Sequence, residues 1–155
     1  MKLKLFVTFA LMALLSACVQ PKAPEMTPLE IQSMQTRSYK NSYNVVFSST
    51  ISVFQDLGYT VSSADKDSGL ISAESATDSS AALLILTGTS QTNQTKATAF
   101  IERIGGKTLV RLNFVEKVET SSGYGRQDRR DKPVLDAQIY QNAFERIENA
   151  IFIRK

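Results

Sequence analysis

The side chains that most often carry chemistry are scarce in this chain. It has 155 residues, with no histidine, no tryptophan and a single cysteine, Cys18. Nucleophilic centres of the Ser-His-Asp or Cys-His type need an imidazole, so the sequence excludes them. Structural zinc sites, histidine-ligated haem and iron–sulfur clusters lack their ligands for the same reason. One thiol cannot form an intramolecular disulfide, so the cysteine needs another explanation.

The residues before Cys18 supply that explanation. Two lysines stand near the start of the chain, and Leu5 to Leu15 is almost continuously apolar. The tetrapeptide Leu15-Ser16-Ala17-Cys18 follows, so we interpret residues 1–17 as a secretory signal peptide with charged, apolar and small-residue regions. The apolar run is shorter than the roughly 20 residues that a membrane-spanning helix needs.

The motif Leu15-Ser16-Ala17-Cys18 resembles the lipobox of bacterial lipoproteins. The resemblance implies a diacylglyceryl group on the Cys18 thiol and a cleavage that makes this cysteine the N-terminus. Several acyl chains, such as palmitate, anchor a protein stably where one chain alone is marginal. In this family an aspartate after the cysteine favours retention in the inner membrane, and the residue here is Val19. The resemblance therefore implies a lipoprotein of the outer membrane whose domain faces the periplasm.

Loss of the signal peptide changes the charge of the chain. The full sequence has 18 basic and 15 acidic residues, a net charge of +3. Two of the lysines lie in the signal peptide, so the mature chain keeps 16 basic residues against 15 acidic ones, a net charge of +1. Such a nearly neutral domain gives no support for a nucleic-acid partner.

Two segments contain groups that could bind a ligand. Asp65-Lys66-Asp67-Ser68-Gly69 has the Asp-x-Asp-x-Gly spacing of a calcium loop but lacks the later acidic ligands, so we interpret it as a hairpin turn. Gly123 to Arg130 is a basic and aromatic segment interrupted by acids, which we interpret as a solvated loop able to contact a partner. The candidate contact residues are Tyr124, Arg126, Arg129 and Arg130.

The carboxylates give no convincing catalytic pair. Glu102 and Glu116 lie on adjacent segments with strand-like alternation, among lysines and arginines that balance their charge. Exposed strand carboxylates explain both residues better than acid–base catalysis does. We therefore expect a protein that is not an enzyme and that holds no cofactor or metal.

The mature chain is expected to begin with a tether and to continue as one domain. Residues 18–27 contain Pro21 and Pro24 and predict a lipidated tether. Thr27-Pro28-Leu29-Glu30 has the capping threonine, proline and glutamate of a helix start. Apolar residues at three- and four-residue spacing predict longer helices over 46–57 and 136–152.

Alternating apolar residues predict the strands. We expect strands at 36–40, 59–64, 70–73, 96–104 and 108–118. The last two flank Gly105-Gly106, a hairpin signal. Segments 87–95 and 119–132 are polar and predict loops, while the apolar block 81–86 fits either a short helix or a buried strand. The expected fold of residues 28–155 is α+β in two layers, with an antiparallel sheet of about four to five strands packed by two amphipathic helices.

Several segments resemble small proteobacterial lipoproteins of uncharacterised function. These segments are Gln35-Thr36-Arg37-Ser38-Tyr39, Phe54-Gln55-Asp56-Leu57-Gly58-Tyr59, Gly69-Leu70-Ile71-Ser72-Ala73, Ile139-Tyr140-Gln141 and Ala150-Ile151-Phe152. The expected order of elements is also similar to the helix-grip domains of the BamC type, which occur in a lipoprotein of the outer-membrane β-barrel assembly machinery.

These features together predict an outer-membrane-anchored periplasmic lipoprotein that binds rather than catalyses. The expected role is a structural or accessory subunit of an envelope assembly or secretion complex, with an envelope protein as its partner. The alternative is a carrier or sensor that holds a small lipid or glycan between its helices and its sheet. A cavity lined by Phe47, Phe54, Phe114 and Phe144 favours the carrier, whereas a solid core with an exposed apolar patch favours the protein partner.

Overall fold

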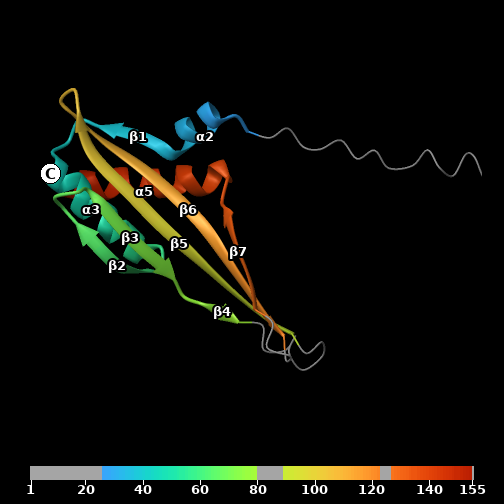
Figure 1. Ribbon diagram of the computed structural model, residues 1–155. Coiled ribbons are helices and arrows are strands. Elements are labelled where there is room, and N and C mark those ends of the chain that lie inside the picture. The colour runs from blue at the N-terminus through green and yellow to red at the C-terminus, as the bar shows by residue number, and fades with distance from the viewer. Residues whose placement is uncertain (1–25, 80–88, 123–126, 155) are drawn as a thin grey trace, which may run out of the picture.

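The computed structural model describes residues 26–79, 89–122 and 127–154, which form three helices and one antiparallel sheet of seven strands (Figure 1). The strands are β1 (Thr36–Tyr39), β2 (Tyr59–Asp65), β3 (Leu70–Ser75), β4 (Asp78–Ser79), β5 (Thr89–Ile104), β6 (Lys107–Ser122) and β7 (Gln127–Pro133). Five of them lie in the order β1-β6-β5-β3-β2, while β4 pairs with β5 and β7 pairs with β6. The expected α+β class is confirmed, but the sheet is larger than the four to five strands that the sequence predicts.

Two amphipathic helices, α3 (Tyr43–Asp56) and α5 (Ala137–Ile153), cover one face of the sheet (Figure 1). Both were expected from their apolar spacing. Asp136 caps α5, because its carboxylate accepts a hydrogen bond from the N–H of Gln138 at 2.9 Å. The core fills the space between this layer and the sheet. It consists of Tyr39, Val46, Phe47, Val53, Phe54, Ile71, Ala73, Ala97, Ala99, Ile101, Val110, Leu112, Phe114, Tyr140, Ala143, Phe144, Ile147 and Ile151.

The short helix α2 (Pro28–Gln35) begins at the expected capping box. The N–H of Glu30 donates to the Thr27 hydroxyl at 3.3 Å, and the N–H of Thr27 donates to the Glu30 carboxylate at 2.7 Å. The helix buries none of its own residues, so contacts at its end fix its position. The amide of Gln35 donates to Asn113 Oδ1 at 3.5 Å and to the Tyr140 hydroxyl at 3.4 Å. These bonds attach α2 to the domain just before β1 begins.

The long hairpin of β5 and β6 runs the whole length of the sheet (Figure 1). Each strand has 16 residues, and Gly105 and Gly106 form the expected turn with φ angles of +57° and +77°. The register is continuous from Ile104 opposite Lys107 to Thr89 opposite Ser122. The prediction of a loop over 87–95 is therefore wrong from residue 89 onward, because polar residues here take part in the backbone ladder of the hairpin.

The prediction of a loop over 119–132 is wrong for residues 119–122 and 127–132, while residues 123–126 lie outside the described residues. The first four residues of this segment complete β6, and β7 follows with every residue exposed. Lys132 lies opposite Glu116, Asp131 opposite Lys117 and Arg129 opposite Glu119. Opposite charges across the strand pair, together with backbone hydrogen bonds, thus support β7 without burial. Its charges and its terminal proline also discourage further strands from adding at this edge.

The hairpin of β2 and β3 confirms the interpretation of Asp65 to Gly69 as a turn. The Asp65 carboxylate accepts hydrogen bonds from the N–H of Asp67 at 3.0 Å and from the Ser68 hydroxyl at 2.7 Å. Gly69 has a φ of +76°, and its carbonyl accepts the N–H of Ile101 at 2.9 Å. The apolar block 81–86, whose structure the sequence left open, lies outside the described residues.

Candidate functional site

The face of the sheet opposite α3 and α5 has no helix packed on it in the described part of the chain (Figure 1). Ile71 and Ala99 point into the core, so their neighbours Leu70 and Phe100 point to this open face. Leu70 and Phe100 are direct partners across β3 and β5. They are 47% and 41% exposed, which is high for large apolar side chains in the middle of a sheet.

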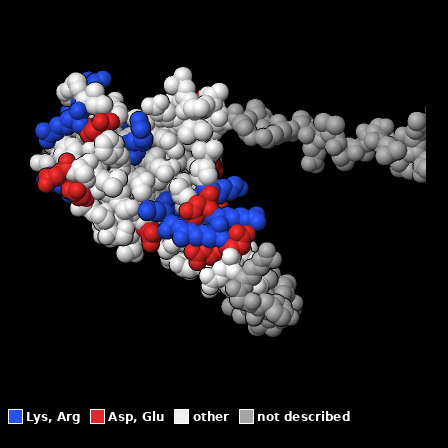
Figure 2. Space-filling view, in the orientation of Figure 1, with Lys and Arg blue, Asp and Glu red and all other residues white. Residues whose placement is uncertain are grey.

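The neighbours of this apolar pair on the open face include charged side chains, since Asp65 lies opposite Leu70 on β2 and Arg111 lies opposite Phe100 on β6. The next row across the three central strands consists of Ser72, Thr98 and Asn113. Beyond it, Lys117 forms an ion pair with Glu74 at 3.1 Å. Figure 2 shows charged side chains toward both ends of the molecule and a basic side chain between them. The apolar pair is therefore flanked by one charged residue on each side within its row and by a neutral row next to it.

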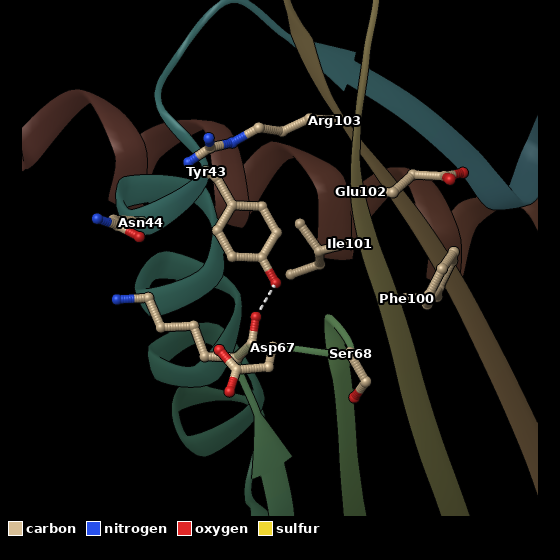
Figure 3. Close-up of a pocket in the computed structure, with 9 residues that line it drawn as sticks. Tyr43, Asn44, Asp67, Ser68, Phe100, Ile101, Glu102 and Arg103 are labelled. Carbon is tan, nitrogen blue, oxygen red and sulfur yellow. Dashed lines mark hydrogen bonds between the residues drawn. The ribbon is translucent and has the colours of Figure 1, made fainter.

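A cleft of about 550 Å³ lies at one border, between the start of α3, the β2–β3 turn and the end of β5 (Figure 3). The Tyr43 hydroxyl points into it and donates to the carbonyl oxygen of Lys66 at 2.6 Å. The Arg103 guanidinium lies 5.2 Å from the centre of the Tyr43 ring, close enough for a cation–π contact. Phe100 and Glu102 project from the other side of β5 and also line the cleft (Figure 3).

The titratable groups of this cleft suit a structural role. Burial raises the pKa of the Tyr43 hydroxyl, and the nearby carboxylate of Asp65 raises it further. Hydrogen bonds from Ser68 and Asp67 lower the pKa of Asp65 itself. Near neutral pH the tyrosine is therefore neutral and the aspartate ionised, and neither is poised to move a proton. The hydrogen bonds of both residues hold the β2–β3 turn against α3.

The four phenylalanines proposed to line a ligand cavity do not form one together. Phe47, Phe54 and Phe144 are 5% exposed or less and pack within the core. Phe114 forms part of a cleft of about 220 Å³, which also contains Leu57, Tyr59, Ile139, Asn142 and Ala143. The arrangement is thus a packed core beside a small apolar cleft between α3, α5 and the sheet.

The other sequence-derived candidates fall in different places. Cys18, Tyr124 and Arg126 lie outside the described residues. Arg129 and Arg130 lie on β7, exposed, and each pairs with a carboxylate of its own strand: Arg129 with Asp131 at 3.2 Å and Arg130 with Asp128 at 3.1 Å. They belong to an ordered edge strand and not to a loop.

Glu102 and Glu116 do not face each other. Glu102 alternates with the buried Ile101 and lies on the open side, whereas Glu116 shares the side of the buried Phe114. The two carboxylates therefore occupy opposite faces of the sheet. The described residues contain no cluster of three or more acidic, cysteine or histidine side chains suited to a metal ion. Nor does any helix among them have the length and apolar character needed to cross a membrane.

Sequence reasoning missed Leu70 and Phe100 as surface residues. The signal was present, because Leu70-Ile71 and Ala99-Phe100-Ile101 are apolar at consecutive positions. Consecutive apolar residues in a strand place apolar side chains on both faces, whereas strict alternation places them on one. The pair was thus detectable as a departure from alternation.

Comparison with known proteins identifies no family. No protein-family model matches the chain, and no curated protein sequence does. Among solved structures, a crystal structure of a DUF4468 family protein from Bacteroides ovatus is similar with a TM-score of 0.39 and 11% identity, over 75% of this chain and 84% of that chain. A likeness of this size carries no functional argument, so function is argued from the residues of this chain.

Proposed function

We propose that the protein is a lipid-anchored, non-catalytic binding subunit of a bacterial envelope. Cys18 carries the lipid and holds the chain at the outer membrane, with the domain in the periplasm. The open face of the sheet binds an envelope protein around Leu70 and Phe100. The protein then serves as a structural or accessory subunit of an assembly or secretion complex.

The observation that carries the binding role is the exposed pairing of Leu70 with Phe100. Protein interfaces combine an apolar centre with a polar rim. The open face has this organisation, since the pair is bordered by the charged Asp65 and Arg111 in its own row and by the polar Ser72, Thr98 and Asn113 in the next row. Covering the two side chains with a partner removes apolar surface from water and favours association.

The alternative role as a carrier has less support. Small-molecule sites usually enclose about 300–1,000 Å³. The cleft beside Phe114 has about 220 Å³, and the three other phenylalanines expected to line a cavity are packed in the core. A bound lipid or glycan would need these core residues to move apart.

The substitution Cys18→Ser tests the anchor. The variant is expected to leave the membrane fraction after a high-salt wash, whereas the wild-type chain remains. Retention of the variant after that wash would refute the lipid anchor at Cys18. Val19→Asp is a companion variant that keeps the thiol: it is expected to stay on membranes but to move to the inner-membrane fraction. An unchanged distribution of this variant would argue against outer-membrane placement.

A pull-down from membranes in mild detergent tests the open face. The wild-type chain is expected to retain an envelope protein in stoichiometric amount, and the double variant Leu70→Ser, Phe100→Ser is expected to lose it. Ile139→Ser is a matched control, because Ile139 is 42% exposed but lies on α5 beside the small cleft. Loss of the partner with Ile139→Ser and not with the double variant would move the binding site to the helical side.

A further inference from the structure

The β5–β6 turn presents a basic surface with an exposed apolar residue. We define this turn surface as Lys40, Arg103, Ile104 and Lys107. The three cations line a cleft of about 500 Å³ together with Asn41, Ser42, Tyr43, Gly105, Gly106 and Thr108, and no carboxylate is among the lining residues. Ile104, next to the glycines of the turn, is 55% exposed. Figure 2 shows basic side chains at this end of the molecule, with acidic side chains beside them.

The cations of the turn surface differ from those at the other end of the sheet. Lys117, Arg129 and Arg130 each have a carboxylate within 3.2 Å. Lys40, Arg103 and Lys107 have no ion pair with any part of the chain that the structure describes, and the Arg103 guanidinium packs on the ring of Tyr43. The adjoining cleft beyond Tyr43 contains Asp67 and Glu102, so the basic region is confined to the turn. Three positive charges without an ion pair in the described residues therefore line one cleft.

The length of the tether allows this surface to reach the membrane. Nine residues, Cys18 to Met26, precede Thr27, and nine extended residues span about 30 Å. From Thr27 to Lys40 the chain passes through α2, whose eight residues rise about 12 Å, and β1, whose four residues rise about 13 Å. A chain anchored at Cys18 can thus place Lys40 at the lipid surface without strain.

We propose that the turn surface docks on the anionic phospholipid headgroups of the membrane that holds the anchor. This inference rests on the proposed lipid anchor at Cys18 and adds a second, weaker membrane contact. The charge complementarity is between the three unpaired cations and lipid phosphates, with Ile104 entering the boundary between headgroups and acyl chains. The anchor raises the effective concentration of headgroups at the turn, so a weak contact is sufficient to orient the domain.

Flotation with lipid vesicles tests the proposal without the anchor. The protein used is a chain that starts at Val19, which retains the entire core because every core residue lies between Tyr39 and Ile151. It is expected to bind vesicles of phosphatidylglycerol and phosphatidylcholine in equal parts, to bind pure phosphatidylcholine far less, and to dissociate as salt is raised. Binding that is equal for both vesicle types, or absent from both, would overturn the proposal.

The double variant Lys40→Gln, Lys107→Gln tests whether these two lysines of the turn surface bind the vesicle. Each lysine near an anionic surface raises the affinity for that surface about fivefold, so the variant is expected to bind the anionic vesicles about thirtyfold more weakly. The matched control is Lys96→Gln, Lys132→Gln, which removes the same charge. Lys96 lies nine residues from Gly105 along β5, or about 30 Å, which is several screening lengths. An equal loss of binding in both double variants would assign the effect to net charge and refute the turn surface.

The vesicle results and the Cys18→Ser result are independent. If Cys18→Ser releases the protein while the shortened chain ignores anionic vesicles, the anchor stands and the turn surface is refuted. If the shortened chain binds anionic vesicles while Cys18→Ser stays on membranes through a high-salt wash, the anchor is refuted.

Discussion

The hydroxyl of Tyr140 donates a hydrogen bond to the carbonyl oxygen of Val134 at 2.9 Å. The same hydroxyl accepts the N–H of Phe114 at 3.3 Å, and the N–H of Val134 donates to the Phe114 carbonyl at 2.9 Å. Val134 directly follows β7, where the chain turns toward α5. One buried phenol on α5 thus satisfies backbone groups of both the central strand β6 and the end of the edge strand β7.

Tyr140→Phe is expected to lower the free energy of unfolding by about 2 kcal/mol, because it leaves buried backbone groups without a partner. Urea denaturation measures this change. Tyr59→Phe is the matched control, since Tyr59 is half-buried and its hydroxyl has no hydrogen-bond partner in the described residues. Equal stability changes in the two variants would mean that the Tyr140 hydroxyl contributes nothing.

Ser49→Ala is expected to stabilise the protein by about 1 kcal/mol. Ser49 is fully buried on α3, and its hydroxyl has no hydrogen-bond partner within the described residues. Alanine removes the unpaired oxygen and favours the helix. The neighbouring Thr50→Ala is a control with the opposite expected sign, because the buried Thr50 hydroxyl donates to the Val46 carbonyl at 2.9 Å. A Ser49→Ala midpoint at or below the wild-type midpoint in urea would contradict the expectation.

Gly69→Ala is expected to destabilise the protein by about 3 kcal/mol or more. An added Cβ would collide with the carbonyl oxygen of Ile101, and the φ of +76° already disfavours any side chain. Gly58→Ala separates the two effects, since Gly58 has a φ of +83° with open space around it. That control should lose only about 1–2 kcal/mol. Thermal or urea unfolding of both variants measures the loss of unfolding free energy. Equal losses would mean that the backbone at Ile101 shifts to avoid the added Cβ and that the collision costs nothing extra.

Stability is expected to fall in strongly alkaline solution because of Tyr39. Burial, above all, raises the pKa of the Tyr39 hydroxyl far above its ordinary value of 10.0. Above that ordinary value the unfolded chain loses the proton while the folded chain keeps it, so unfolding becomes easier as pH rises. The slope for one such group is at most about 1.4 kcal/mol per pH unit. Tyr39→Phe should flatten the decline in unfolding free energy above pH 10; an unchanged slope would assign the decline to other groups.

The sequence predicts the parts of the fold that depend on burial. The amphipathic helices, the turn at Gly105-Gly106 and the hairpin closed by Asp65 to Gly69 all carry local signals, and the structure confirms them. The far half of β5 carries no such signal, because Thr89 to Thr95 is polar throughout. It becomes a strand through pairing with β6, which is a long-range effect that periodicity does not register.

The candidate site could be predicted only in part for a related reason. Period-two alternation tells which residues share a face, but not which face the helices cover. Leu70 and Phe100 became surface residues only when α3 and α5 were seen to pack on the other side. Arg129 was correctly recognised as exposed, yet its pairing with Asp131 depends on β7 being extended.

The 16-residue strands of the β5–β6 hairpin also determine how far the domain extends from the membrane. At about 3.3 Å per residue the hairpin is about 50 Å long, whereas the 17 residues of α5 cover about 26 Å. With the turn surface on the lipid, as we propose, the other end of the hairpin lies farther from the membrane than the helices do. The Leu70–Phe100 pair lies close to the β5–β6 turn, so in this arrangement a partner that binds there is held near the bilayer.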